Sequence, residues 1–273
     1  MASPTEITVQ QLSKLIGLPN CPALIDIRID EDFDADPRFI PGARRRLHAD
    51  LQTWLSHYAG QKAVIICHKG KKLSQGVAAL MRAEGVEAET LEGGFVAWAE
   101  AGLPTVNPAR LPEPDGQGRT LWVTRARPKV DRVACPWLIR RFVDPNAVFL
   151  FVSPSEVMDV ADRFGAEPFD LEGGFWSHRG EECTFDTMLR EFELDQPALR
   201  HLSVIVRGAD TARPDLAPEC AGLLAASLGL SRMYRDDLHQ LDAAMGVYDA
   251  FYRWCRDATE EAHDWPMQSG GGK

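Results

Sequence analysis

Residues 63–85 read AVIICHKGKKLSQGVAALMRAEG, and this stretch decides the fold class of the first part of the chain. The β-branched apolar run 63–67 predicts a buried strand, and 74–85 has helical spacing with Val77, Leu80 and Met81 facing inward. Another such run, ALIDI (23–27), precedes it, and AETLEGG and FVAWAEAG follow. Apolar runs that alternate with helical segments predict an α/β domain with a parallel sheet, whose ligands bind at the carboxyl ends of the strands.

Cys67 is expected to be the last residue of its strand, ahead of a helix that begins near Leu73 or Ser74. A loop at that point turns backbone N–H groups inward at the positive end of the helix dipole, so it can hold an anion. A thiol beside such a loop ionises more readily, and the thiolate is the nucleophile. The alternative is that Cys67 is an inert, buried strand end. The loop residues are His68, Lys69, Gly70, Lys71 and Lys72.

Four motifs in order, over roughly residues 5–105, resemble the rhodanese family of sulfurtransferases. The resemblance implies that Cys67 takes sulfur from thiosulfate or a persulfide, holds it as a persulfide, and passes it to a thiol or cyanide without a cofactor. The loop from Cys67 to Lys72 fits this family, because the related phosphatases have a loop one residue longer that ends in Arg. The motifs are LIDIR (24–28) with DF (32–33), FIPGA (39–43), CHKGKK (67–72), and LEGGFVAW (91–98) with GLP (102–104).

Two positions depart from the pattern of that family. Lys72 stands where Arg is common, and Leu73 stands where a small residue is usual. Lysine cannot offer a planar bidentate fork, so we expect looser recognition of the anion. Asp26 and Arg28 are interpreted as a supporting ion pair near the loop, because buried charges are normally paired.

The chain divides at a segment rich in proline and glycine. We expect a first domain at 1–106, a linker at 107–118, a second, helix-rich α+β domain at 119–260, and a flexible tail at 261–273. In the second domain LWVT (121–124) and AVFLFV (147–152) predict strands, and 132–143 predicts a helix capped by Asp131. Because Pro136 is tolerated only in a first turn, this helix is expected to begin near Cys135.

Residues 119–141 carry seven cations against the single Asp131. Cys135 near a helix start, with Arg125, Lys129, Asp131 and Arg132 around it in sequence, is a candidate oxyanion or redox site. The alternative that Cys135 and Trp137 are core residues, with the cations in solvent, stays open.

His178, Cys183 and Asp210 are candidate metal ligands in the second domain. Cys183 follows His178 by five residues before a predicted helix, and SVIVRGAD (203–210) is expected to be a strand that ends at Asp210. Mixed nitrogen, sulfur and oxygen donors admit zinc, manganese or iron. Spacing of this kind also fits residues with separate roles in the core.

The second half, roughly 119–257, resembles the C-terminal domain of the chromate-resistance protein ChrB family. The resemblance implies a role in chromate sensing or detoxification, in which Arg125, Lys129, Arg132 and Cys135 face the oxyanion. Relatives that regulate transcription have a different N-terminal region, so DNA binding does not carry over. The motifs are WVTR (122–125), PKVDR (128–132), ACPWLIRRF (134–142), CTF (183–185) after His178, IVRGAD (205–210) and YDAFY (248–252).

Composition restricts the class of protein further. The net charge is −10, and about −9 of it belongs to 111–273, which disfavours a nucleic-acid-binding surface. No apolar run reaches the ~20 residues of a membrane helix, and MASPTEITVQ lacks the features of a signal peptide, so we expect a cytoplasmic protein without membrane contact. The six cysteines include no C-x-x-C pair, which argues against a zinc ribbon or a disulfide framework.

Three functions are consistent with these residues. The first is sulfur transfer at Cys67 linked to chromate resistance, or to oxyanion or oxidative stress. The second is a chromate- or sulfur-responsive regulatory protein in which the segment 119–141 recognises an anion or a partner. The third is a metal-dependent activity within residues 119–257.

Overall fold

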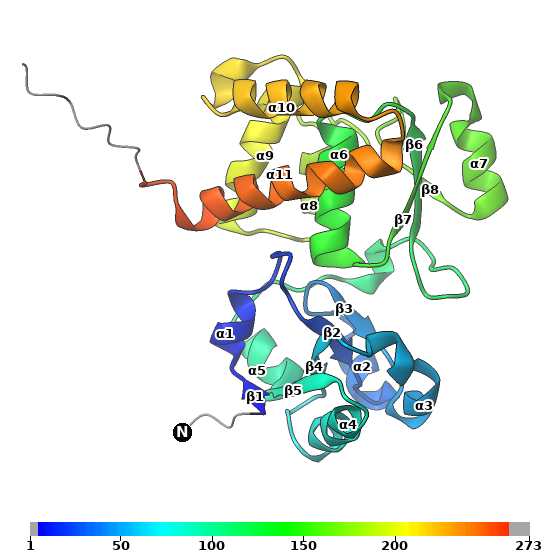
Figure 1. Ribbon diagram of the computed structural model, residues 1–273, viewed down its shortest axis with the longest axis vertical. Helices are drawn as coiled ribbons and strands as arrows, with labels where there is room; N and C mark the ends of the chain where they lie inside the picture. Colours follow the sequence, from blue (N-terminus) through cyan, green and yellow to red (C-terminus); the bar gives the residue numbers. More distant parts are fainter. Residues whose placement is uncertain (1–4, 262–273) are drawn as a thin grey trace, which may run out of the picture.

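The computed structural model describes residues 5–261, and its first half is built on a five-stranded parallel sheet in the order β1-β5-β4-β2-β3 (Figure 1). Every neighbouring pair of strands is parallel, so all carboxyl ends meet at one edge of the sheet. The predicted α/β class is therefore confirmed. The strands are β1 (Glu6–Ile7), β2 (Ala23–Asp26), β3 (Ala43–Arg45), β4 (Lys62–Ile66) and β5 (Glu87–Leu91).

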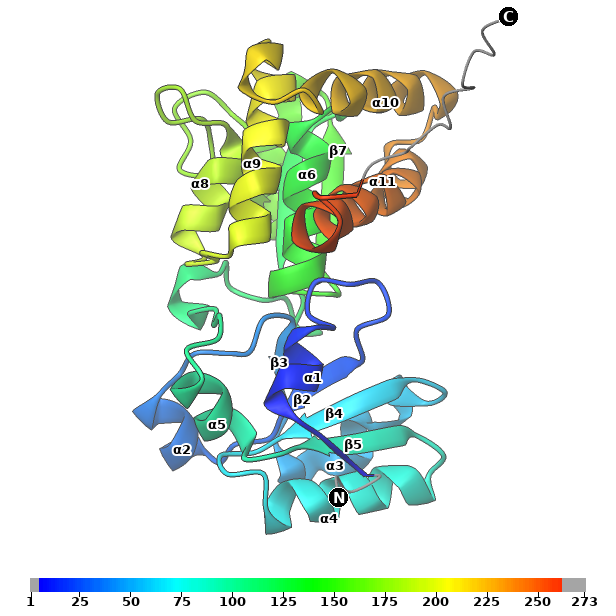
Figure 2. The ribbon, with the colours of Figure 1, turned by 90° about the vertical axis from the view of Figure 1, so that its left-hand side faces the viewer.

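Helices cover both faces of this sheet (Figures 1 and 2). On one face Leu24, Val64 and Ile66 belong to the same hydrophobic cluster as residues of α1 (Val9–Ser13) and α5 (Gly94–Glu100). On the other face Ile25, Ile65 and Cys67 join residues of α3 (Leu51–Trp54) and α4 (Lys72–Ala83). The sheet is buried on both sides, which explains the apolar runs of its strands β2 and β4. A short helix, α2 (Asp30–Ala35), follows β2.

The second half has a three-stranded parallel sheet in the order β7-β6-β8. One face packs through Val123 on α7 (Val157–Phe164), and the other, which carries Trp122, packs on a layer of helices (Figure 1). This arrangement confirms the prediction of a helix-rich second part. The elements are β6 (Leu121–Arg125), β7 (Val148–Val152), β8 (Glu167–Pro168), α6 (Asp131–Leu138), α8 (Thr184–Glu191), α9 (Pro197–Asp210), α10 (Cys220–Met233) and α11 (Asp237–Asp257).

Two predictions about the second half are wrong. Residues 203–210 form the end of α9 and not a strand, because the buried residues of α9 recur at helical spacing through Leu199, Leu202, Ile205 and Val206. The helix predicted over 132–143 is found, because α6 begins at Asp131 and continues as a π-helical turn over 139–143, but the placement of Pro136 in its first turn is wrong.

Pro136 therefore lies inside α6 and not in its first turn. The first turn is held by the Val130 carbonyl, which accepts from the N–H groups of Val133 and Ala134. Pro136 itself removes only one hydrogen bond from this helix.

The two halves share one hydrophobic core. A single cluster of buried side chains runs from Leu12 and Trp98 in the first half to Phe142 and Tyr252 in the second. Gly17 contacts the Phe142 ring so closely that an added Cβ would lie 2.3 Å from it. The two sheets are thus parts of one packed body.

Residues 107–118, predicted as a linker, contain one 3-10 turn, Pro108–Arg110, and lead into β6. The predicted tail lies outside the described residues from 262 onward. Within residues 5–261 no helix combines the length and the apolar character needed to cross a bilayer. Further 3-10 turns occur at His48–Asp50, Leu55–Tyr58, Pro154–Glu156 and Pro214–Leu216.

Candidate functional site

Cys67 directly follows β4 and precedes the loop that leads to α4. The strand ends one residue earlier than predicted, at Ile66, and the helix begins slightly earlier, at Lys72. The relative solvent exposure of Cys67 is 6%, whereas Cys135 and Cys183 are completely buried. Cys67 therefore stands at the edge of the core, at the carboxyl end of the sheet.

The backbone of the loop is oriented by α5. The Cys67 and His68 carbonyls accept hydrogen bonds from the N–H groups of Phe95 (2.9 Å) and Val96 (3.0 Å). In a trans peptide the carbonyl and the next N–H point in opposite directions, so the N–H groups of His68 and Lys69 point away from α5. Since α5 covers the other face of the sheet, they point toward the side of the Cys67 thiol. Within residues 5–261, no N–H of 68–72 donates a backbone or side-chain hydrogen bond.

Glycines at two positions allow the loop to pack on the turn before α5. Gly70 has φ +63°, and a Cβ there would lie 2.3 Å from the Leu91 carbonyl oxygen. Gly94 has φ +64°, and a Cβ there would lie 2.3 Å from the Cys67 carbonyl oxygen. Only glycine fits either position, because both the backbone conformation and the space exclude a side chain.

The side chains of the loop leave its outer surface cationic. Lys69, Lys71 and Lys72 are exposed, and none of them forms an ion pair with a described carboxylate. His68 is partly buried, and its Nδ1 lies 4.0 Å from Asp32 Oδ1, too far for a hydrogen bond. Leu73 packs on the hydrophobic cluster below Cys67.

Ser74 is a contact of the thiol that the sequence did not reveal. The Cys67 Sγ–H donates to Ser74 Oγ at 3.2 Å, and Ser74 Oγ–H donates to the Lys71 carbonyl at 3.0 Å. Ser74 lies in the first turn of α4 and is fully buried. The helix thus fixes the orientation of the thiol as well as the end of the loop.

Asp26 and Arg28 form the buried ion pair that was expected. Arg28 Nη2 lies 2.6 Å from Asp26 Oδ2, and the guanidinium also donates to the carbonyls of Asp36 and Arg38. It lies 3.8 Å from the centroid of the Phe95 ring. Because the Phe95 N–H donates to the Cys67 carbonyl, the contact of Arg28 with the Phe95 ring links this ion pair to the loop.

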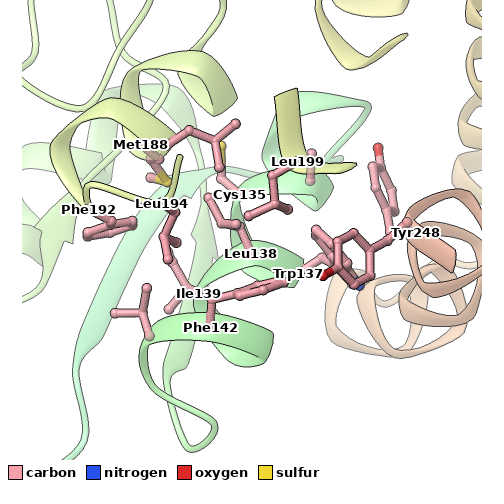
Figure 3. Close-up of a cluster of buried hydrophobic side chains, with 14 of the residues drawn as sticks. Cys135, Trp137, Leu138, Ile139, Phe142, Met188, Phe192, Leu194, Leu199 and Tyr248 are labelled. Carbon is pink, nitrogen blue, oxygen red and sulfur yellow. The ribbon is translucent and has the colours of Figure 1, made fainter. Parts of the chain in front are cut away.

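Cys135 is a core residue in the structure, which corrects its assignment to an oxyanion or redox site. Its side chain is fully buried, and Figure 3 shows it among Leu138, Met188 and Leu199. Burial, reinforced by nearby aspartates, raises the pKa of its thiol well above the usual range. Trp137 is also buried, as the alternative interpretation expected.

The cations of 119–141 are mostly paired with aspartates and do not surround Cys135. Lys129 is the exception, since it is exposed and forms no ion pair among the described residues. The pairs are Arg119–Asp115, Arg125–Asp170, Arg127–Asp237, Arg132–Asp170, Arg140–Asp242 and Arg141–Asp249.

Three of these cations face a groove at the junction of the two halves. The groove is open to solvent and has a volume of about 1330 Å³. Arg46, which also lines it, pairs with no described carboxylate, and its Nε is buried without a hydrogen-bond partner. The groove is therefore rich in arginine although the chain is acidic, but its other five arginines each pair with an aspartate. Its arginines are Arg44, Arg45, Arg46, Arg119, Arg140 and Arg141.

A second cluster of ionisable side chains consists of His178 and three aspartates around it. Its Nε2 lies 3.4 Å from Asp131 Oδ2, 3.5 Å from Asp170 Oδ1 and 3.2 Å from Asp210 Oδ2. We call these four residues the Asp–His cluster. Two of the three predicted metal ligands, His178 and Asp210, belong to it.

Cys183 does not belong to this cluster. Its Sγ lies 3.2 Å from Asp186 Oδ2, and its backbone N–H donates to the same carboxylate at the start of α8. Asp170, which does belong, was missed because it follows β8, a strand of two residues that is too short to show a pattern.

In the Asp–His cluster the imidazole of His178 favours the charged forms of the carboxylates, whereas Asp170 and Asp210 disfavour the charge on Asp131. Hydrogen bonds to Asp131, Asp170 and Asp210 raise the pKa of His178 to about 12. Burial raises the pKa of Asp131 to about 6, although His178 opposes this shift. Burial also disfavours the charged form of Asp170, but hydrogen bonds from His178, Thr184 and Arg125 outweigh it and lower its pKa.

Two protein-family models match the chain: Rhodanese-like domain over residues 8–101, and ChrB, C-terminal domain over residues 122–255. The chain is 36% identical over 137 residues to Protein ChrB of Cupriavidus metallidurans. That match covers 50% of this chain and 40% of that protein, so the chain spans less than half of the relative's length.

Solved structures resemble the first part of the chain. SSP1007 from Staphylococcus saprophyticus is 28% identical and covers 36% of this chain and 97% of its own (TM-score 0.32). A rhodanese-like domain protein from Staphylococcus aureus is 27% identical and covers 37% and 96% (TM-score 0.32). A thiosulfate sulfurtransferase from Pseudomonas aeruginosa is 28% identical and covers 37% and 19% (TM-score 0.33). Residues 8–101 are therefore similar to the rhodanese-like domain family, and residues 122–255 to the ChrB C-terminal domain family.

Proposed function

We propose that the protein is a rhodanese-type sulfurtransferase in which Cys67 is the nucleophile. The observation that carries this proposal is the loop of residues 68–72, whose N–H groups donate no hydrogen bond within residues 5–261. Those of His68 and Lys69 point toward the side of the Cys67 thiol. Backbone N–H groups in this arrangement, at the start of a helix of 12 residues, stabilise an anion. The same groups favour the thiolate and, later, the persulfide anion.

The reaction has two steps and involves no net oxidation. In the first, the Cys67 thiolate attacks the outer sulfur of thiosulfate, the sulfur–sulfur bond of thiosulfate breaks, and sulfite leaves with the electron pair. In the second, cyanide or a thiolate attacks the outer sulfur of the Cys67 persulfide. Thiocyanate or a new persulfide leaves, and the Cys67 thiolate is regenerated with its proton in solvent.

The lysine side chains of the loop contribute positive charge and take no part in making or breaking bonds. The ammonium groups of Lys69, Lys71 and Lys72 offset the charge of a dianionic donor. Since Lys72 binds as a point charge, the loop recognises a tetrahedral sulfonate less strictly than an arginine would.

A sulfur-transfer assay tests the proposal. With thiosulfate as donor and cyanide as acceptor, the wild-type protein is expected to form thiocyanate, and Cys67→Ser to form none. Cys21→Ser is the matched control, because Cys21 lies outside the loop and burial raises the pKa of its thiol to about 12. Absence of turnover with thiosulfate and with organic persulfides in the folded wild-type protein would contradict the proposal.

The ChrB-like half connects this activity to chromate resistance in our proposal. A second candidate function, an oxyanion-responsive regulatory protein, is favoured by the arginine-lined junction groove. It predicts saturable chromate binding by calorimetry that persists in Cys67→Ser and weakens in Arg46→Ala. If chromate does not bind, or binds equally to Arg46→Ala, the groove has no such role.

A further inference from the structure

Four elements of the ChrB-like half bring their ends to one point. Asp131 begins α6, Asp170 follows β8, His178 precedes α8, and Asp210 ends α9. Asp131 and Asp170 are almost fully buried, whereas His178 and Asp210 keep 39% and 19% of their side-chain surfaces exposed. The Asp–His cluster is therefore buried on the side of Asp131 and Asp170 and accessible to solvent on the side of His178 and Asp210.

Asp131 and Asp170 are each held by contacts outside the cluster, and the oxygens that face His178 take part in these contacts. Asp131 accepts from the N–H groups of Thr184 (2.6 Å) and Phe185 (3.3 Å) at the start of α8. Asp170 accepts from Thr184 Oγ1 and from Arg125. These contacts fix the carboxylates in place before any ligand arrives.

His178 cannot satisfy the three carboxylates by itself. Its Nε2 carries at most one hydrogen, yet three carboxylate oxygens lie within 3.5 Å of that atom. The ligand atoms of Asp131, Asp170 and His178 all lie within 4.8 Å of one another. An ion with bonds of ~2.1 Å holds adjacent ligand atoms ~3 Å apart and opposite ones ~4.2 Å apart. The cluster is thus close to the dimensions of a cation site.

An independent observation comes from Thr124 on the neighbouring strand. Thr124 is fully buried, and its Oγ1 has no hydrogen-bond partner among the described residues. Alternation along β6 puts it on the face of Trp122, whose ring packs on Phe169. Because Val123 pairs with Pro168, Thr124 lies at the level of Phe169, one residue before Asp170. The unpartnered hydroxyl therefore lies on the helix-covered face of β6, one position along the sheet from Asp170, where water bound to an ion would supply the missing partner.

We propose that Asp131, Asp170 and His178, with the carboxylate of Asp210 beside them, bind one divalent transition-metal cation such as Mn²⁺ or Fe²⁺. Carboxylate oxygens and an imidazole nitrogen are hard to borderline donors, and no sulfur takes part because Cys183 lies apart. Arg125 and Arg132 bind Asp170 from outside and limit the negative charge of the set. The exposed side leaves coordination positions for water or an oxyanion. This inference is independent of sulfur transfer at Cys67.

Direct metal binding tests the proposal. The full chain is treated with EDTA, dialysed, and titrated with Mn²⁺ while free Mn²⁺ is followed by electron paramagnetic resonance. The expected stoichiometry is one Mn²⁺ per chain. His178→Gln and Asp210→Asn, which change partly exposed residues, are each expected to weaken binding by roughly tenfold or more. Thermal unfolding of each variant establishes that it is folded.

Two control variants make the result specific. His239→Gln changes an exposed histidine in α11, and Cys183→Ser removes the sulfur that the sequence had suggested as a ligand. Both are expected to bind Mn²⁺ as the wild type does. Failure of the wild type to bind Mn²⁺, Fe²⁺ or Zn²⁺ would overturn the proposal. So would unchanged affinity in folded His178→Gln and Asp210→Asn, or loss of binding in Cys183→Ser.

Discussion

At the scale of single residues, the cysteines differ in their capacity to react. Burial raises the pKa of Cys21 and of Cys255 to about 12, and it raises the pKa of Cys135, Cys183 and Cys220 as well. A thiol with a pKa near 12 is ionised in only ~1 in 10,000 molecules at pH 8. Because the thiolate is the species that is alkylated, iodoacetamide is expected to modify Cys67 first at pH 8.

Peptide mass spectrometry after brief alkylation measures this selectivity. Between pH 8 and pH 10 the ionised fraction of Cys21 rises ~100-fold, so the preference for Cys67 is expected to narrow. Modification of Cys21 or Cys255 ahead of Cys67 at pH 8 would show that the loop does not activate the thiol.

Individual site residues were predictable only where the sequence around them had a pattern. Cys67 stood between an apolar run and a helix, and its loop contained the cations. Ser74 and Asp170 had no such context, since their roles depend on contacts that folding creates. Cys183 was misassigned because proximity to His178 in sequence says nothing about the direction of a side chain at a helix start.

At the scale of elements, the loop after β4 depends on its packing against the turn before α5. Gly70→Ala is expected to lower the free energy of unfolding by about 2 kcal/mol, because the added Cβ meets the Leu91 carbonyl and the backbone is left-handed. Sulfur transfer is expected to fall further than stability alone explains, since the N–H groups of 68–72 shift.

Denaturant unfolding combined with the cyanide assay measures both effects. Gly76→Ala in the adjoining helix α4 is the control, because its added Cβ meets no atom within 4 Å. If Gly70→Ala and the wild type have equal activity and stability, the packing of this loop is not needed for sulfur transfer.

Strands β2 and β4 could be predicted because they contain apolar runs, whereas β1 and β3 are short and show no such pattern. The misassignment of 203–210 arose from the same feature. In α9 the apolar residues of one helical face include the adjacent pair Ile205 and Val206, which resembles a short strand when it is considered alone. The packing of α9 on α11, α10 and α8 shows that these apolar residues form the buried face of a helix.

At the scale of the whole molecule, the junction of the two halves is held by a buried ion pair as well as by the shared core. Arg44 Nη1 lies 2.8 Å from Asp144 Oδ1, and Asp144 Oδ2 accepts from the N–H and hydroxyl of Thr120. Asp144→Ala leaves Arg44 and the buried Thr120 N–H without this partner. The expected loss of unfolding free energy is about 3 kcal/mol.

Thermal unfolding of Asp144→Ala checks this value. Asp242→Ala is the control, since its ion pair with Arg140 is largely exposed and contributes about 0.5 kcal/mol. Because one cluster spans both halves, wild type and variants are expected to unfold in a single transition. Two separate transitions would show that the halves fold independently.

Sulfur transfer by this protein requires the loop after β4 to hold Cys67 as an anion that accepts sulfur. Intact-mass spectrometry after incubation with thiosulfate, in the absence of an acceptor, detects that step. The protein is expected to gain one sulfur atom, which maps to Cys67, disappears on addition of cyanide, and is absent in Cys67→Ser. If the folded wild-type protein gains no sulfur, or gains it on another cysteine, Cys67 is not the sulfur acceptor.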